Sequence, residues 1–210
     1  MDLILKKLRT PNLVFIGKVN YYPDKMDWIT YDIKDCVYKN MDYLRESGHK
    51  RIAYMGGFDN EDTPPDFSKF AYFEQYMNSH PELAFAGSMV GEHGVENGSR
   101  MMNQWLDENR ELPDAFLISN DPIAIGAIKT LNEHSIQVPD MVSVTAINGD
   151  SSGTFSFPTL STVDVHTYEM GKEAVAVLEE RIRHRRTLAK KVEFQAELVR
   201  WGSVKKMSGN

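Results

Sequence analysis

Short segments follow three apolar runs of the sequence, and two of them hold the residues best suited to contact a ligand. The segments are Gly56-Gly57-Phe58, Ser119-Asn120-Asp121 and Asn148-Gly149-Asp150. An asparagine side chain can both donate to and accept from a polyhydroxylated molecule. In an open parallel sheet, ligands bind outside the carboxyl ends of the strands. These positions therefore predict ligand contacts for Asn120 and Asn148, and indicate neither catalysis nor phosphate binding.

Each of these polar residues also has a purely structural interpretation. Asp121 precedes Pro122 and suits the N-cap of a helix, with the proline at the first helical position. Asn148 precedes Gly149 and could simply shape a turn. Asn120 is harder to explain structurally, because Asp121 already accounts for the cap. Position alone leaves both interpretations open for the two asparagines.

The apolar runs predict buried strands, because they are short, mostly apolar and largely without alternation. They comprise residues 13–16, 51–55, 115–118 and 142–147. Apolar residues at helical spacing predict helices between and after them. These helices comprise residues 33–47, 66–77, 95–109, 121–134 and 168–185. The alternation predicts an α/β fold with a doubly wound parallel sheet and helices on both faces.

Bulk composition narrows the class of protein. The chain has 210 residues, of which 41% are hydrophobic and 26% charged, which suits a globular protein with a real core. A net charge of −6 argues against a domain that grips nucleic acid by itself. The single cysteine, Cys36, suits a reducing compartment. The amino-terminal apolar run Leu3–Leu5 is too short for a signal peptide, and no stretch is long enough to cross a bilayer. We expect a soluble, cytoplasmic protein without membrane contacts.

Motifs for other kinds of site do not occur in the sequence. There is no G-x-G-x-x-G segment and no P-loop to hold nucleotide phosphates. The six histidines are scattered, without the spacing of a metal site. No G-x-S-x-G elbow indicates a hydrolase. We therefore expect no metal, no cofactor and no catalytic residues.

Five segments, in order and at matching spacing, resemble the LacI/GalR family of bacterial transcription regulators. The resemblance covers about residues 12–203. The segments are Ser47–Tyr54 (SGHKRIAY), Ser119–Gly126 (SNDPIAIG), Val138–Asn148 (VPDMVSVTAIN), Phe157–Val163 (FPTLSTV) and Glu197–Ser203 (ELVRWGS). The resemblance implies the fold of periplasmic binding proteins, in which two sheet subdomains close around a small effector, most often a sugar.

The resemblance also implies a division of the chain. Residues 1–28 and 164–187 resemble a remnant of the amino-terminal effector subdomain. Residues 29–163 and 188–204 resemble a complete carboxyl-terminal effector subdomain. The helix-turn-helix and hinge that read the operator in that family have no counterpart here.

Four residues match effector contacts of that family. Asn120 matches the asparagine that binds sugar hydroxyls, and Asn148 matches the Asp or Asn at the next strand end. Lys69 lies where the family usually has an arginine, so it keeps the charge without the two-pronged donor geometry. His93 lies where an aromatic ring usually stacks on the sugar. These two departures put the identity of the sugar in doubt.

The implied function is allosteric control of a repressor, in which an effector changes operator affinity by binding one state better than the other. The resemblance implies that the missing amino-terminal domain reads operator DNA and that the regulator acts as a homodimer, for which the helix after Pro122 is the hypothesised contact. A sugar-binding or solute-binding protein of a transport system is the first alternative, because it shares the fold. An enzyme with a doubly wound fold is the second, and no arrangement of acid, base or nucleophile supports it.

Overall fold

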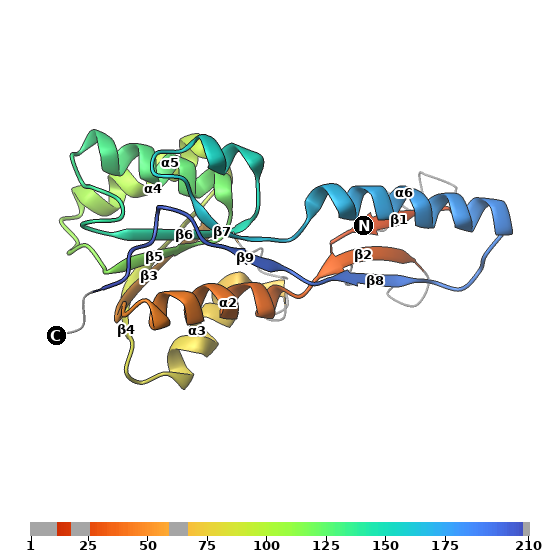
Figure 1. Ribbon diagram of the computed structural model, residues 1–210, viewed down its shortest axis with the longest axis horizontal. Helices are drawn as coiled ribbons and strands as arrows, with labels where there is room; N and C mark the ends of the chain where they lie inside the picture. The colour runs from red at the N-terminus through yellow and green to blue at the C-terminus, as the bar shows by residue number, and fades with distance from the viewer. Residues whose placement is uncertain (1–11, 18–25, 59–66, 208–210) are drawn as a thin grey trace. The chain divides into compact units, whose positions relative to one another are not determined.

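The protein is seen in a computed structural model that describes residues 12–17, 26–58 and 67–207 (Figure 1). The chain divides into two compact units. The first unit comprises Met1–Asp32 and His166–Gln195, and the second comprises Ile33–Val165 and Ala196–Asn210. The chain therefore passes between the units three times, after residues 32, 165 and 195.

A six-stranded sheet forms the centre of the second unit, in the order β4-β3-β5-β6-β7-β9. Its strands are β3 (Arg51–Gly57), β4 (Ala84–Gly91), β5 (Ala115–Ile118), β6 (Ser143–Asn148), β7 (Ser161–Asp164) and β9 (Glu197–Val199). All neighbouring pairs are parallel except β7 and β9, which are antiparallel. The carboxyl ends of β4, β3, β5 and β6 therefore lie side by side at one edge.

Helices cover both faces of this sheet (Figure 1). One layer holds α2 (Ile33–Glu46) and α3 (Lys69–Ser79), and the other holds α4 (Val95–Asp107) and α5 (Asp121–Glu133). A short 3₁₀ helix, η2 (Ser151–Phe155), follows β6. The predicted doubly wound α/β fold is thus confirmed. Helix α2 ends in a left-handed cap, because Gly48 has a φ of 91°.

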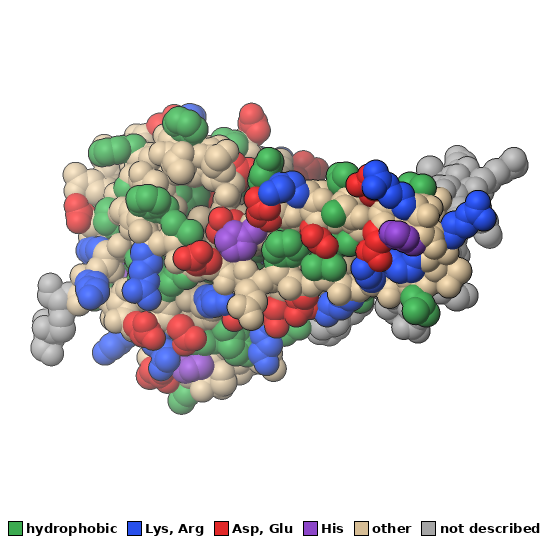
Figure 2. Space-filling view, turned by 45° about the vertical axis from the view of Figure 1, so that its right-hand side comes forward, with side chains coloured by type: hydrophobic (Ala, Val, Ile, Leu, Met, Phe, Trp, Pro, Cys, Tyr) green, Lys and Arg blue, Asp and Glu red, His purple; other side chains and the backbone are tan. Residues whose placement is uncertain are grey.

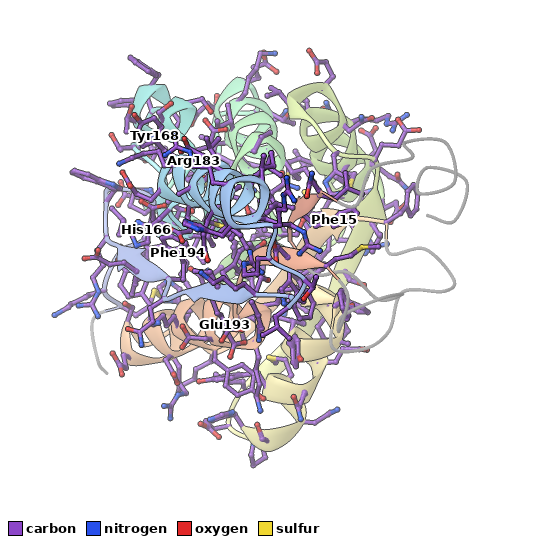
Figure 3. All side chains as sticks on the ribbon, turned by 90° about the vertical axis from the view of Figure 1, so that its right-hand side faces the viewer. Phe15, His166, Tyr168, Arg183, Glu193 and Phe194 are labelled. Carbon is purple, nitrogen blue, oxygen red and sulfur yellow. The ribbon has the colours of Figure 1, made fainter. Side chains whose placement is uncertain are left out.

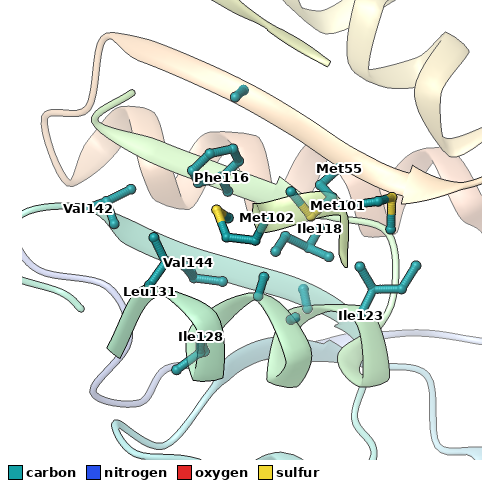
Figure 4. Close-up of a cluster of buried hydrophobic side chains, with 14 of the residues drawn as sticks. Met55, Met101, Met102, Phe116, Ile118, Ile123, Ile128, Leu131, Val142 and Val144 are labelled. Carbon is teal, nitrogen blue, oxygen red and sulfur yellow. The ribbon is translucent and has the colours of Figure 1, made fainter. Parts of the chain in front are cut away.

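The largest apolar core lies between the sheet and the layer of α4 and α5 (Figure 4). Met101 and Met102 of α4 meet Ile123, Ile128 and Leu131 of α5 over the inward side chains of the central strands, in a cluster that also contains Met55, Phe116, Ile118, Val142 and Val144. Trp105 is fully buried there and meets Phe116 edge to face. Burial of this cluster is the main stabilising contribution to the second unit.

The first unit has a smaller parallel sheet, in the order β1-β2-β8. It consists of β1 (Val14–Ile16), β2 (Asp27–Tyr31) and β8 (Lys191–Phe194), with α6 (Thr167–His184) packed on β1 and β2. Successive side chains of β8 point to opposite faces, so Phe194 lies on the α6 side and Glu193 away from it (Figure 3).

A buried ion cluster joins β2 to the end of α6. Asp27 has no solvent exposure, and its two oxygens accept from Arg186 Nη1 and Nη2 at 2.9 and 2.8 Å. The backbone N–H of Lys190 donates to the same carboxylate at 2.7 Å, and Arg181 Nη1 lies 3.1 Å from it. Burial alone would raise the pKa of Asp27. The hydrogen bonds from Arg186, the Lys190 backbone and Arg181, together with the charge of Arg181, outweigh burial and lower that pKa.

Several boundaries differ from the sequence-based expectations. The second unit begins at residue 33 rather than 29, and β8 lies in the first unit because it pairs with β2. Helix α3 begins at Lys69, whereas Asp66, its predicted start, lies outside the described residues. Five strands have no counterpart among the predicted apolar runs: β2, β4, β7, β8 and β9.

The visible surface carries charges of both signs. Figure 2 shows acidic and basic side chains interspersed over one face of the described residues. Among these residues, no helix has the length and apolar character needed to span a bilayer.

Candidate ligand-binding site

The structure brings the four predicted contact residues together at the carboxyl edge of the six-stranded sheet. His93 follows β4, Asn120 follows β5, and Asn148 ends β6. Lys69 is the first residue of α3, which follows β3 in the chain. Because these strands are parallel neighbours, residues distant in the sequence lie at one edge.

Asn120 and His93 form one hydrogen-bonded pair. The Asn120 side-chain oxygen accepts from the backbone N–H of Ile123 at 3.1 Å, so its nitrogen faces His93. That nitrogen lies 2.8 Å from His93 Nδ1. An amide nitrogen only donates, so Nδ1 accepts and the neutral imidazole carries its proton on Nε2. The pair therefore leaves an N–H donor on His93 for a ligand.

The bond to Ile123 corrects one prediction. Asn120, and not Asp121, is the N-cap of α5, and Asp121 and Pro122 are its first two helical residues. Asn120 has extended backbone angles and the Oδ1 bond of a cap, whereas Asp121 directs its carboxylate elsewhere. Asn120 thus has a structural role in addition to its position at the site.

Gly57 allows His93 to lie against the end of β3. A Cβ atom on Gly57 would be 2.2 Å from the imidazole Cε1, far inside contact distance. The amide of Gly57 donates to the Ser119 hydroxyl at 3.2 Å, which joins the ends of β3 and β5. The steric role of this glycine could not be predicted from the strand end alone, because it depends on His93, 36 positions later.

Lys69 and Asn148 form the second pair. Lys69 Nζ donates to the backbone oxygen of Ser119 at 2.6 Å and lies 3.5 Å from Asn148 Oδ1. The ammonium group therefore bridges the ends of β5 and β6. Because the amide oxygen faces Lys69, the Asn148 nitrogen points away from Lys69 and remains as a donor.

Two further features of the site were missed in the sequence. Asn148 has a φ of 139°, in the region that favours glycine, and Gly149 follows with a φ of 73°. Asp121 is fully buried and accepts from the backbone N–H of Asp150 and from the Thr162 hydroxyl. Burial raises the pKa of Asp121, and the two hydrogen bonds and the charge of Lys69 only partly offset it.

The arrangement suits recognition of an uncharged or polar molecule by hydrogen bonds. Amide, imidazole and ammonium groups converge on one sheet edge, supported by a buried carboxylate. In the part of the chain that the structure describes, no group of three or more His, Cys, Asp or Glu side chains could hold a metal ion.

Comparison with known proteins places this site in a family. Residues 41–204, which include all four predicted contact residues, match the model of the periplasmic binding protein-like domain. The chain belongs to this family. The matched residues include all six strands of the second unit's sheet, together with α6 and β8 of the first unit.

Curated relatives of this periplasmic binding protein-like chain are transcription regulators of the helix-turn-helix type, as the LacI/GalR resemblance predicted. The regulator GanR of Bacillus subtilis is 33% identical over 203 residues, which cover 94% of this chain and 61% of GanR. The repressor MelR of the same organism is 32% identical over 202 residues, covering 91% of this chain and 56% of MelR. The chain thus spans about 60% of the length of these relatives.

Solved structures share the fold of this periplasmic binding protein-like chain. A LacI-type regulator from Bacillus cereus subsp. cytotoxis superposes with a TM-score of 0.85 at 22% identity, covering 99% of this chain and 72% of its own. A LacI family regulator from Enterococcus faecium with bound ribose gives 0.80 at 18% identity, covering 97% and 74%. The predicted periplasmic-binding-protein-like architecture is therefore confirmed.

Proposed function

We propose that this chain is the effector-binding part of a LacI/GalR-type transcription regulator, a repressor that senses a small sugar. The observation that carries the proposal is the convergence of Lys69, His93, Asn120 and Asn148 at one sheet edge. Hydrogen-bonding side chains of this kind suit the hydroxyl groups of a sugar. Ribose in the Enterococcus faecium neighbour and the regulator names of the relatives support it.

The mechanism follows from linkage. An effector can change operator affinity only by the difference between its affinities for the two states of the regulator. We assign binding of the operator DNA to a part of the protein outside the residues that match the relatives. We place the regulator in the cytoplasm, because its DNA lies there. The first unit is then the remnant of the amino-terminal effector subdomain. The second unit is the carboxyl-terminal one. The proposal includes no catalytic step, metal or cofactor.

The first test is a thermal-shift screen of the protein against neutral and phosphorylated sugars, including D-ribose and D-galactose. A sugar at about 100 times its Kd should stabilise the protein by about 2.7 kcal/mol. The variant Asn148→Gly removes the amide and suits the positive φ, so it should fold while binding at least about tenfold more weakly. The variant Asn120→Asp keeps the cap oxygen but loses the donor, and should weaken binding similarly.

The matched control is Asn109→Gly. Asn109 also has a positive φ, 51°, but it follows α4 at the opposite end of that helix from His93. Its replacement should leave sugar binding unchanged. Unaltered sugar binding in Asn148→Gly would contradict the role of Asn148 in the proposed site. The absence of any thermal shift in the wild-type protein would contradict the proposal that the effector is a sugar.

A sugar-binding or solute-binding protein of a transport system remains the second candidate, because it would have the same fold and a similar site. The whole gene product distinguishes the two. A regulator should bind DNA upstream of its own operon, with an affinity that changes when the sugar is added. A transport protein should bind the sugar without binding that DNA.

We also propose that the regulator is a homodimer, paired on the side of α5. Phe155 and Phe157 are 89% and 88% exposed, and the Phe157 oxygen accepts from the Asn132 side chain of α5. Exposed aromatic residues of this size are typical of interaction surfaces. A Lac repressor that shares the fold is described as dimeric.

Sedimentation velocity tests this pairing. The combined change Phe155→Ser and Phe157→Ser should weaken self-association at least about tenfold, a loss of about 1.4 kcal/mol. Leu188→Ser is the control, since Leu188 is 77% exposed in the first unit. A wild-type protein that remains monomeric at high concentration would remove the proposal.

A further inference from the structure

The two backbone amides that follow Asn148 donate to side-chain oxygens rather than to backbone oxygens. The amide of Gly149 donates to the Thr162 hydroxyl at 3.4 Å, and the amide of Asp150 donates to Asp121 Oδ2. The Thr162 hydroxyl donates in turn to Asp121 Oδ1 at 2.7 Å. Both consecutive amides are therefore anchored, directly or through one hydroxyl, to a single carboxylate.

The backbone at this point needs an anchor. Asn148 has a φ of 139° and Gly149 one of 73°, and both conformations disfavour an ordinary L residue. A Cβ on Gly149 would lie 2.4 Å from the Asp164 carboxyl carbon, so the loop passes close to β7. Such a conformation persists only where surrounding contacts specify it. The Asn148 side chain depends on this conformation for its direction.

Asp121 is also joined to the other half of the site. It directly follows Asn120, which caps α5 and binds His93. Its carboxylate therefore links the segment that carries Asn120 to the loop that follows Asn148. The residue itself is fully buried, so it does not lie among the groups exposed to a ligand.

We propose that Asp121 is a positioning residue of the binding site, which fixes the Asn148 amide relative to Asn120 by anchoring the Gly149–Asp150 backbone. This role rests on the proposed effector site and deepens it. A carboxylate suits the role because it offers two acceptor atoms, one for the Asp150 amide and one for the Thr162 hydroxyl. Alanine would leave both donors without their acceptor, whereas asparagine keeps one oxygen and can donate to the hydroxyl.

The first arm of the test needs no sugar. Amide hydrogen exchange of Asp150, measured by NMR on the full chain, should be at least about tenfold faster in Asp121→Ala than in the wild type. Asp121→Asn should restore most of the protection. Unchanged exchange in Asp121→Ala would overturn the proposal, whatever the protein binds.

The second arm measures binding of D-ribose and D-galactose by calorimetry. Asp121→Ala should weaken binding of the sugar that the wild type takes at least tenfold, and Asp121→Asn should weaken it less. Ser203→Ala is the control, because the buried Ser203 hydroxyl makes two similar bonds, to Val144 O and from the Ser161 amide, at the start of β6 and β7. It should lower Tm without changing affinity.

The outcomes separate the two proposals. Equal loss of affinity in Ser203→Ala and Asp121→Ala would show a general effect of stability and overturn the positioning role. If the wild type binds neither sugar, the proposed function loses support, while the exchange of the Asp150 amide still decides whether Asp121 positions the loop.

Discussion

Replacing Gly126 with alanine should destabilise the second unit by about 3 kcal/mol or more. A Cβ at this position would lie 1.9 Å from the backbone oxygen of Val95 and 2.8 Å from the amide nitrogen of Ser99. Both atoms belong to the backbone of α4, so no side-chain rotation can relieve the overlap. Alanine favours a helix by about 1 kcal/mol over glycine, but this gain is smaller than the steric cost.

The close approach of the two helices is reciprocal. A Cβ on Gly98 would lie 2.1 Å from the backbone oxygen of Ile123 in α5. The Ser99 hydroxyl also donates to the Gly126 oxygen at 3.0 Å, a bond that separation of the helices would break. Moving α4 away would also loosen the methionine-rich core between both helices and the sheet (Figure 4).

Urea unfolding followed by far-UV circular dichroism measures this loss. The control is Gly171→Ala in α6, where a Cβ would meet no atom within 4 Å. That change should stabilise its helix by up to about 1 kcal/mol. A Gly126→Ala protein as stable as the wild type would show that α4 and α5 can separate without cost, contrary to the packing described.

Replacing Asp27 with asparagine should destabilise the first unit by about 3–5 kcal/mol. The change keeps the size of the side chain but removes its charge. Arg181 and Arg186, whose side chains are 7% and 13% exposed, would then lack the carboxylate that they share. A buried charge without its partner costs far more than the pair itself contributes.

Hydrogen exchange measured by mass spectrometry assigns the loss to its unit. Exchange should become faster in residues 27–31 and 167–184, while residues 115–118 should keep their protection. Glu179→Gln is the control, because its surface pair with Arg183 contributes at most about 1 kcal/mol. Equal protection of residues 27–31 in Asp27→Asn and wild type would refute this role for the cluster.

The same cluster predicts a dependence on pH. The pKa of Asp27 is lowered in the folded protein, so its stabilising contribution is complete above the unfolded value of about 3.9. The contribution is lost as the pH falls through the folded pKa. The difference in stability between the wild type and Asp27→Asn should therefore narrow as the pH falls below about 4.

Buried central strands could be predicted from the sequence because both of their faces are apolar, as in Ala115–Ile118. Edge and peripheral strands could not. Strand β4 contains exposed Phe85 and Val90 at the edge of the sheet, and β2 begins with a buried aspartate that no apolar pattern includes. The partners of Asp27 lie more than 150 residues away in the sequence, so no local window reveals them.

The residues of the candidate site that lie at the carboxyl ends of strands could be predicted from the sequence. Asn120 and Asn148 follow from the rule for parallel sheets, while only the family resemblance marked Lys69 and His93. The cap of α5 was assigned to the wrong residue because Asn120 and Asp121 are both good cap residues. Asp121 is distinguished by Thr162, 41 residues later, a contact that requires the folded sheet.

Because the chain passes between the two units three times, a ribosome synthesises part of the first unit before the second unit and part of it afterwards. Residues 33–165 form one uninterrupted segment of the second unit, which includes strands β3 to β7 of the six-stranded sheet and helices α2 to α5. Strands β1 and β2 emerge before that segment, but α6 and β8 emerge after it. Asp27 leaves the ribosome 159 residues ahead of Arg186. Strand β2 therefore remains without its partner β8 while most of the larger unit is synthesised, and the smaller sheet is completed only when β8 follows, shortly before β9 completes the larger sheet.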